Sequence, residues 1–573
     1  ASVKKQIEDC NLTGIEFVES NSRYYPLGDF CSYVVGYAKS YNDQSVKKMV
    51  GEMGLELSYD KQLKGKNGYK VYQTDANGYA LVDGTLREKD PTNGNDLYLT
   101  IDSGLQRNLD YLMSNAYSES GAEVVTAGVM EIKTGKILAM STYPSFNPNE
   151  RNISTFNNYF LEGTIECGSV FKPFIYADSI EEGKYDHNAY YNSGSYNVYY
   201  GNKLVATIKD HNGGQGWGTI TYDQGLYHSS NVAICNLLDQ GYVTKDVLTD
   251  KLNDLGFFQG DTVDGLTCSS SINAYTRKNA GRLEYLTTGF GQGSTVTPYQ
   301  LLKAYSVFGN DGKTVQPHIV DKVVNPETNK VVYQATPKYS KQIFSTNTIS
   351  QVKDLMLGVI EDEQGTGKTY RLDNDVRMIG KTGTGQVVEN GGYSTTLYMH
   401  SFVGIAPYDD PQVVMFLTFK SGDSYAQYMP NIVKQTMNEA LQVVNRYNAK
   451  NTTAVDQSYT LDSYTNQSVN YVKSKLESKS LSVQIIGNGS SVIEQYPLAK
   501  SKVTSGDKVF IKTEGKDITL PNLIGWSKKE VQTYASLAGI QLTIDGTSGH
   551  VTAQSVGENT VVHSGDSLTV AIS

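Results

Sequence analysis

The stretch "ECGSVFKPF", Glu166 to Phe174, places Ser169 three residues before Lys172. A serine hydroxyl is a poor nucleophile at neutral pH, so this S-x-x-K spacing is useful chemically only if the lysine is neutral and within hydrogen-bond reach. At the start of a helix, residues three apart lie on one face, which would bring the two side chains together. The same spacing also occurs at serines that are more simply interpreted as surface residues: Ser2, Ser45, Ser58, Ser350 and Ser505. The motifs that follow therefore decide how Ser169 is interpreted.

Two further short motifs follow Ser169 along the chain. In "GLYHSSNVAICNLL", Ser229 and Asn231 form S-x-N at the start of an apolar helical run. The stretch "MIGKTGTGQ" then predicts a short strand that ends in a K-T-G motif, Lys381, Thr382 and Gly383, with Thr384 directly after it. S-x-x-K, S-x-N and K-T-G in this order are the motif set of penicillin-binding proteins and class A β-lactamases. The order, rather than any single motif, makes the pattern specific.

Each motif also has copies or neighbours that favour a simpler interpretation. Ser145 and Ser271 begin two other S-x-N stretches. Lys133 begins a second K-T-G, which lies before Ser169. The sequence around it predicts two buried strands joined by a turn at Thr134 and Gly135, so we expect this second motif to be part of a hairpin turn. His228 lies next to Ser229, but a lone histidine near a helix start is expected to be structural.

The composition bounds the class of protein. At 573 residues the chain is too long for one core and predicts several domains. A formal charge of -10, with no cluster of Lys and Arg, argues against nucleic acid as a partner. The five cysteines follow no metal-ligand spacing, and His211 and Asp210 lack further ligands, so we predict neither a metal nor another cofactor. The absence of an apolar run of 18 residues predicts no membrane span within this sequence.

Five segments are predicted. Residues 1–95, with short alternating strands, predict an extended α+β module. A compact domain is expected over 96–446, entered by a strand at Leu97 to Ile101 and a helix capped by Asp102. Residues 447–466 are a polar linker, and a cut near Thr453 should leave that domain folded. Two small modules, 467–514 and 515–573, repeat with a period of 59 residues, so that Val492 matches Val551 and Gln495 matches Gln554. Each copy is long enough for one helix and a three-stranded sheet.

Taken together, the sequence resembles a class B penicillin-binding protein, a peptidoglycan D,D-transpeptidase, of the type with two C-terminal PASTA modules. Besides the three motifs, "SRYYPLGDFCSYVVGY", "TGKILAMSTYPSFNPN", "GFGQGSTVTPYQLLKAYSVFGNDG" and "LPNLIGWSKKEVQTYASLAGI" carry the resemblance. It implies a multidomain α+β fold: a transpeptidase domain, made of an antiparallel sheet packed with helices plus an all-helical part, an elongated N-terminal pedestal of the dimerisation type, and the two modules. One departure is Cys167, where the family usually has proline.

The resemblance also implies roles for the motif residues. Ser169 would be the nucleophile and Lys172 its base, activated by burial and by the charge of Lys381. Asn231 would hold Lys172 and the substrate amide, and Ser229 would relay a proton to the leaving amine. Substrate binding falls to the K-T-G strand: Lys381 and Thr382 would bind the terminal carboxylate of a D-Ala-D-Ala stem peptide, next to Gly383, and the backbone N–H of Thr384 would complete an oxyanion hole with that of Ser169.

The implied setting is the bacterial cell wall. The expected partners are stem peptides, β-lactam antibiotics, a membrane glycosyltransferase and division proteins. Members of the family are anchored in the membrane by an N-terminal helix, which we expect to lie outside this sequence, and their catalytic part lies outside the membrane. Two copies of the PASTA module favour a role in division over sporulation. Two alternatives remain open: a catalytically idle, penicillin-recognising scaffold, against which the intact Lys172, Asn231 and Lys381 speak, and a serine β-lactamase, which needs a deacylating carboxylate that the sequence does not identify.

Overall fold

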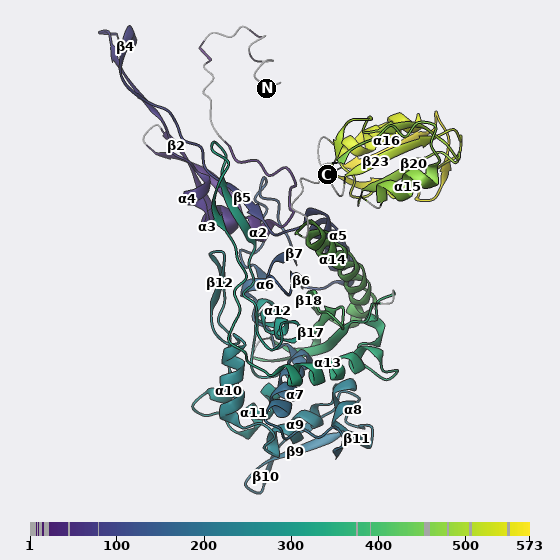
Figure 1. Ribbon diagram of the computed structural model, residues 1–573. Coiled ribbons are helices and arrows are strands. Elements are labelled where there is room, and N and C mark those ends of the chain that lie inside the picture. The colour runs from purple at the N-terminus through teal and green to yellow at the C-terminus, as the bar shows by residue number, and fades with distance from the viewer. Residues whose placement is uncertain are drawn as a thin grey trace.

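The computed structural model describes residues 7, 10, 14–15, 22–43, 46–77, 80–373, 376–389, 391–451, 459–477, 479, 481–503, 507–546 and 550–572. Figure 1 shows three parts: a central body, long N-terminal hairpins that extend from one end of it, and a pair of small C-terminal modules beside that end. Thr453, the expected cut site, lies outside the described residues. In the parts of the chain that are described, no helix combines the length and the apolarity that a bilayer-spanning helix requires.

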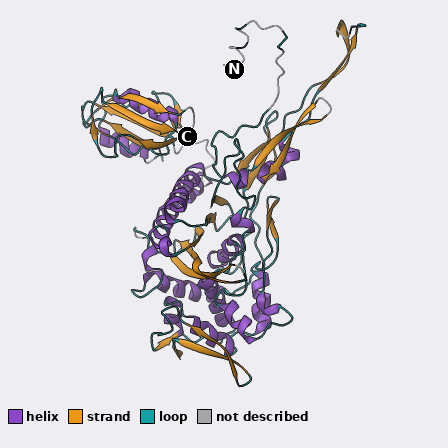
Figure 2. Ribbon diagram, turned by 180° about the vertical axis from the view of Figure 1, so that it is seen from behind, coloured by secondary structure: helices purple, strands orange, loops and turns teal. Residues whose placement is uncertain are grey.

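The central body is built on one antiparallel sheet of five strands. Their order is β16 (Ile379–Glu389), β17 (Gly392–Ala406), β18 (Val413–Ser421), β6 (Val124–Glu131) and β7 (Ile137–Tyr143). Successive side chains of a strand point to opposite faces, and both faces are buried here: Val414 and Phe416 of β18 enter one core, while Met415 and Leu417 enter another. Figure 2 shows the strands between two groups of helices.

One face of the sheet is covered by α5 (Ser103–Ser120) and α14 (Met429–Asn451), which share a core with it. The predicted cap of α5 is confirmed, because Asp102 Oδ1 accepts hydrogen bonds from the backbone N–H groups of Gly104 and Leu105, each at 3.0 Å. The preceding strand, β5 (Asp96–Leu99), is confirmed close to its predicted position and pairs with β14 (Val320–Asn325), which also pairs with β15 (Lys330–Gln334).

The other face packs against the second helical group. It consists of α6 (Tyr159–Glu162), α7 (Lys172–Glu181), α8 (Tyr222–Tyr227), α9 (Asn231–Asp239), α10 (Lys245–Asp254), α11 (Arg282–Gly289), α12 (Pro298–Tyr305) and α13 (Thr346–Glu361). This part is not all-helical as predicted. It also contains three short antiparallel pairs, β8 (Tyr190–Asn192) with β11 (Thr219–Thr221), β9 (Ser195–Tyr200) with β10 (Lys203–Lys209), and β12 (Asp261–Val263) with β13 (Leu266–Cys268). The many glycines of residues 190–221 allow the turns that connect β8, β9, β10 and β11.

The two K-T-G motifs lie in different structures. The one at Lys133 occupies the turn between β6 and β7, and the predicted hairpin is confirmed. The one at Lys381 was expected at the end of a short strand, which is wrong: β16 has 11 residues and the motif lies near its beginning. Among the strands that the structure describes, β16 pairs with β17 alone, so it is an edge strand of the sheet and its other side is free to line a cleft.

The N-terminal part consists of two hairpins and short helices. Its elements are α2 (Ser32–Val35), β1 (Tyr37–Asp43), β2 (Val46–Met53), α3 (Gly54–Ser58), α4 (Asp60–Leu63), β3 (Tyr69–Thr74) and β4 (Ala80–Lys89). The predicted extended α+β character is confirmed, since β1 pairs with β2 and β3 with β4, both antiparallel. Figure 1 shows the β3–β4 hairpin pointing away from the central body.

Each C-terminal module has one helix and a three-stranded sheet, as predicted. The first has α15 (Val469–Glu477) with β20 (Ser482–Ile486), β23 (Lys508–Thr513) and β21 (Val492–Tyr496), and the second has α16 (Lys528–Ala538) with β25 (Gln541–Asp545), β28 (Ser567–Ile572) and β26 (Val551–Gln554). Two-residue strands add a small pair in each: β19 (Tyr459–Thr460) with β22 (Lys502–Val503), and β24 (Ile518–Thr519) with β27 (Val561–Val562).

The two modules repeat at the level of single hydrogen bonds. Gln495 Oε1 accepts from the backbone N–H of Tyr464, and Gln554 Oε1 accepts in the same way from Leu523, each at 2.7 Å. The modules also pack on each other, because Phe510 of the first lies in the core of the second, where its ring centroid is 5.9 Å from that of Trp526.

Candidate active site

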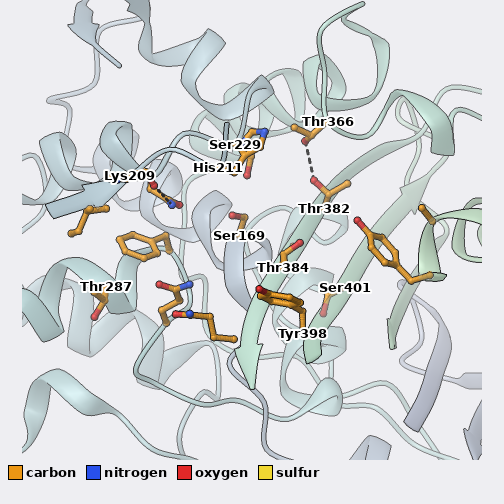
Figure 3. A pocket seen from close by; sticks show the side chains of 18 of the residues that line it. Ser169, Lys209, His211, Ser229, Thr287, Thr366, Thr382, Thr384, Tyr398 and Ser401 are labelled. Atoms are coloured by element: carbon orange, nitrogen blue, oxygen red, sulfur yellow. Dashed lines mark hydrogen bonds between the residues drawn. The ribbon is translucent and has the colours of Figure 1, made fainter. Parts of the chain in front are cut away.

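The three motifs meet at one cleft of about 740 Å³ between β16 and the second helical group. Six of the eight predicted site residues line it: Ser169, Ser229, Asn231, Thr382, Gly383 and Thr384. The other two, Lys172 and Lys381, are fully buried beneath the lining. Figure 3 shows Ser169 at the centre of the cleft, with Ser229 above it and Thr382 and Thr384 on the neighbouring strand.

Ser169 lies in a 3-10 turn, Gly168–Phe171, that leads directly into α7. The turn is held tightly against two other segments. Gly168 has φ +61, and a Cβ there would lie 2.3 Å from the carbonyl oxygen of Thr384; a Cβ at Gly291 would lie 2.1 Å from the carbonyl oxygen of Gly168. Cys167, where a softer approach was expected, is buried, and burial raises the pKa of its thiol. The neutral thiol packs in the core.

Lys172 is the first residue of α7 and reaches the S-x-N motif. Its Nζ donates to the backbone oxygen of Ser229 at 2.5 Å and to the Ser229 hydroxyl at 3.4 Å. Burial lowers the pKa of Lys172 to about 7, and the negative charge of Asp210 partly opposes this effect. The lysine is therefore able to act as a base near neutral pH. The prediction named burial and the charge of Lys381 as causes, and burial is the leading one.

Lys381 reaches the same hydroxyl from the opposite side. Its Nζ donates to Ser229 Oγ at 2.8 Å and to the backbone oxygen of Thr382 at 3.0 Å. Burial, followed by the charge of Lys172, lowers the pKa of Lys381 well below its ordinary value. Two ammonium groups on one hydroxyl repel each other, so loss of a proton from one lysine is favoured while the other stays charged. Ser229 is placed to pass a proton between them.

Asn231 does not hold Lys172 as predicted. Its Nδ2 donates to the backbone oxygen of Lys209 at 2.9 Å, and its place near Lys172 is taken by Ser229. Asn231 still lines the cleft, where its amide is available to a ligand. Thr382 is held from the other wall, because its Oγ1 donates to Thr366 Oγ1 at 2.9 Å, as Figure 3 shows.

One feature near the motifs was missed in the sequence. Asp210, a buried carboxylate, accepts hydrogen bonds from the S-x-N stretch, and no local pattern marks this contact because the partners are distant in sequence. His228 was expected to be structural, and this is confirmed: its ring stacks on that of Trp217, with ring centroids 4.5 Å apart and an angle of 8° between the planes. Among the described residues, no three His, Cys, Asp or Glu side chains are grouped so that they could hold a metal ion.

The chain belongs to the penicillin-binding protein transpeptidase family, of class B with two PASTA domains. The family resemblance found in the sequence is thereby confirmed. Residues 125–442 match the penicillin binding protein transpeptidase domain and residues 1–99 the penicillin-binding protein dimerisation domain. Two PASTA domains match residues 459–515 and 518–573. Proteins of this family are peptidoglycan D,D-transpeptidases, which fits the edge strand, the cleft and the three motifs described above.

Similar proteins come from several organisms. Stage V sporulation protein D of Bacillus subtilis is 30% identical over 533 residues, which cover 90% of this chain and 79% of that protein. The peptidoglycan D,D-transpeptidase FtsI homolog of Mesostigma viride is 28% identical and covers 72% of this chain and 70% of its own length. The crystal structure of penicillin binding protein 2X from Streptococcus thermophilus covers 100% of this chain and 86% of its own, with 25% identity and a TM-score of 0.68.

Proposed function

We propose that this protein cross-links peptidoglycan stem peptides through an acyl-enzyme on Ser169. The observation that carries the proposal is the Ser229 hydroxyl, which contacts Lys172 and Lys381 together beside the Ser169 turn. A neutral base, a proton relay and a cation for a carboxylate are what a serine acyl transfer from a D-Ala-D-Ala peptide requires.

In the first half-reaction, Ser169 Oγ attacks the carbonyl carbon of the penultimate D-alanine, and its proton passes to neutral Lys172. The backbone N–H groups of Ser169 and Thr384 stabilise the oxyanion that forms. The C–N bond then breaks, and the proton moves from Lys172 through Ser229 to the nitrogen of the departing D-alanine. The free carboxylate of that alanine is bound by Lys381 and Thr382.

In the second half-reaction, the amine of another stem peptide attacks the ester carbon. Its proton passes to Lys172, the bond between the carbon and Ser169 Oγ breaks, and Lys172 returns the proton to Ser169. The products are the cross-link and the free enzyme. Asn231, whose Oδ1 is not used in its bond to Lys209, binds the amide of the donor peptide during both steps. A β-lactam enters by the first half-reaction, since it also presents an amide carbonyl and a carboxylate.

Mass spectrometry of the protein after exposure to a labelled penicillin tests this function. A lasting adduct that maps to Ser169 is expected. An adduct on Ser2, Ser45, Ser58, Ser350 or Ser505 would overturn the assignment of the nucleophile. Rapid return to the free mass would indicate a β-lactamase, and the absence of any adduct would indicate an idle scaffold.

The cellular role that we propose is synthesis of septal cell wall during division, with the catalytic part outside the membrane and with a membrane glycosyltransferase and division proteins as partners. The two PASTA domains support this role. Sporulation is a second candidate, because the Bacillus subtilis relative is named for that process. Depletion in the bacterium that encodes the chain separates them: filamentous cells indicate division, and normal growth with defective spores indicates sporulation.

A further inference from the structure

Asp210 is a buried charged residue that the mechanism above does not use. It follows β10 directly and is 2% exposed. We propose that Asp210 is a positioning residue of the acylation machinery: its carboxylate holds the stretch Ser229–Val232 in the shape that presents the Ser229 hydroxyl to both lysines. This inference rests on the proposed function of Ser169 and extends it to a residue outside the three motifs.

The contacts of the carboxylate support this role. Oδ1 accepts from the hydroxyl of Ser230 at 2.8 Å, from the backbone N–H of Asn231 at 2.7 Å and from that of Val232 at 3.1 Å. Oδ2 accepts from the backbone N–H of Gly194 at 2.8 Å, so the carboxylate itself is fixed from the opposite side. Three consecutive residues of the S-x-N stretch thus converge on one oxygen, next to the residue that contacts the lysines.

The backbone at Ser229 needs such support. Ser229 has φ +57, a left-handed conformation that is uncommon for a residue with a side chain and carries strain. Before the turn, the backbone N–H of Ser229 donates to the oxygen of Leu226 at 3.0 Å. After it, Asp210 fixes the chain, and its negative charge lies at the N-terminus of the nine-residue helix α9, where it is favourable. The conformation is therefore held from both sides.

The neighbouring residue completes the arrangement. The backbone oxygen of Lys209 accepts from Asn231 Nδ2, so the dipeptide Lys209–Asp210 fixes the side chain of Asn231 as well as its backbone. Asp210 is fixed in turn by a backbone hydrogen bond from its N–H to the oxygen of Gly194 at 2.9 Å. A shift of the hairpin β9–β10 would consequently move Ser229 and Asn231 together.

The charge of Asp210 also acts on Lys172. Four groups face Lys172. They are the carboxylate of Asp210, the thiol of Cys235 on α9, the side chain of Lys381, which contacts the same Ser229 hydroxyl, and the ring of His211 on the cleft wall. Burial lowers the pKa of Lys172, and Asp210 is the strongest group that opposes it, which leaves the pKa at about 7. A base works best when its pKa lies near the pH of the reaction, so a lysine without this carboxylate would be neutral but too weakly basic.

The test compares two variants of the full chain, Asp210→Asn and Ser230→Ala, by stopped-flow acylation with a chromogenic cephalosporin between pH 5.5 and 9. Asp210→Asn removes the charge, and we expect the rate at pH 8 to fall by about 10- to 100-fold through displacement of Ser229. The midpoint of the acid limb should also move down from about pH 7 by on the order of one unit. Ser230→Ala removes the hydrogen bond to Asp210 and the cap that the hydroxyl accepts from the backbone N–H of Ala233, but it keeps the charge, so its midpoint should stay and its rate should fall less.

A wild-type rate in Asp210→Asn, or a lowered rate with an unmoved midpoint, would overturn the proposal, because a merely structural residue would not change the pH profile. Should Asp210→Asn lack the circular dichroism of the folded protein, Asp210→Glu takes its place: a lowered rate with the midpoint kept supports the proposal, and an unchanged rate overturns it. Failure of the proposed function is distinct, since the wild-type protein would then form no adduct on Ser169.

Discussion

The two K-T-G tripeptides of this chain have the same residues and opposite surroundings. Lys133 lies in the turn between β6 and β7 with 43% of its side chain exposed; its Nζ donates to the backbone oxygen of Gly309 at 2.8 Å and lies 3.9 Å from a carboxylate oxygen of Asp410. Lys381, near the start of the edge strand β16, is fully buried and donates to Ser229 and Thr382. Burial and the neighbouring lysine, rather than the tripeptide, give Lys381 its altered pKa.

The comparison shows what makes a lysine useful in this site. An exposed lysine stays charged and solvated, and its surface ion pair contributes little. A buried lysine loses part of its affinity for protons, because water no longer stabilises the charge. The four predictions that follow test this difference, and the first has the largest expected effect.

Replacing Lys172 by Arg should nearly abolish acylation. Arginine keeps the positive charge but cannot release its proton in this pH range, so the base is lost. The acylation rate should fall by a factor on the order of 10² to 10⁴, the usual contribution of a general base. Stopped-flow measurements with a chromogenic cephalosporin at several pH values give the rate. Recovery of activity at high pH would contradict the assigned role.

Acidification should slow acylation by the wild-type protein. Lys172 is the active base when neutral, and its pKa of about 7 lies below the ordinary value for lysine. The rate should therefore be constant above pH 7 and fall about tenfold for each further pH unit below it, as the protonated fraction rises. The variant Lys133→Ala should give the same profile. A rate that stays constant down to pH 5 would show that the base is not a lysine of this kind.

Replacing Lys381 by Arg should weaken the enzyme without abolishing it. The cation that faces the substrate carboxylate is kept, although its geometry and size change, so we expect a loss of about tenfold, mainly in substrate capture. The matched change Lys133→Arg in the other tripeptide should leave both steps unaltered. If Lys381→Arg proved less active than Lys172→Arg, the roles of the two lysines would have to be exchanged.

The smallest effect is expected from removing the PASTA domains. Among the described residues, the hydrophobic cores of the two modules draw on residues between Leu461 and Ile572 alone, and the cores of the central body include none of these. A chain that ends near Thr453 should therefore acylate at a rate within about twofold of the full chain. Binding of a fluorescent penicillin to the two proteins measures this. Loss of binding in the shorter chain would make the modules part of the catalytic unit.

The sequence predicted those parts of the site that local patterns encode. The order of the motifs led us to expect Ser169, Lys172, Ser229 and Lys381 in one place, and the structure brings them together. The cap at Asp102 and the repeat of Gln495 at Gln554 followed from short-range signals. All these features depend on residues whose chemistry and spacing are visible in the chain itself.

The parts that were missed depend on contacts made only in three dimensions. Asp210 stands in a glycine-rich stretch without periodicity, and its partners Gly194 and Asn231 lie 16 and 21 residues away. Asn231 could reach either Lys172 or the oxygen of Lys209, and only the position of β10 decides between them. The length of β16 was underestimated, because its glycines interrupt the pattern expected of a strand.

The close fit around Gly168 limits how this enzyme can evolve under antibiotic pressure. A Cβ at Gly168 would collide with the carbonyl oxygen of Thr384 in β16, and one at Gly291 with that of Gly168, so a substitution at either glycine would push Ser169 away from the strand that we propose binds both drug and substrate. Such a change would remove cell-wall synthesis together with drug sensitivity. Heritable changes that lower the affinity for β-lactams are therefore expected on the outer walls of the cleft, where Thr287, Thr366 and Tyr398 stand and a larger or smaller side chain can be accommodated.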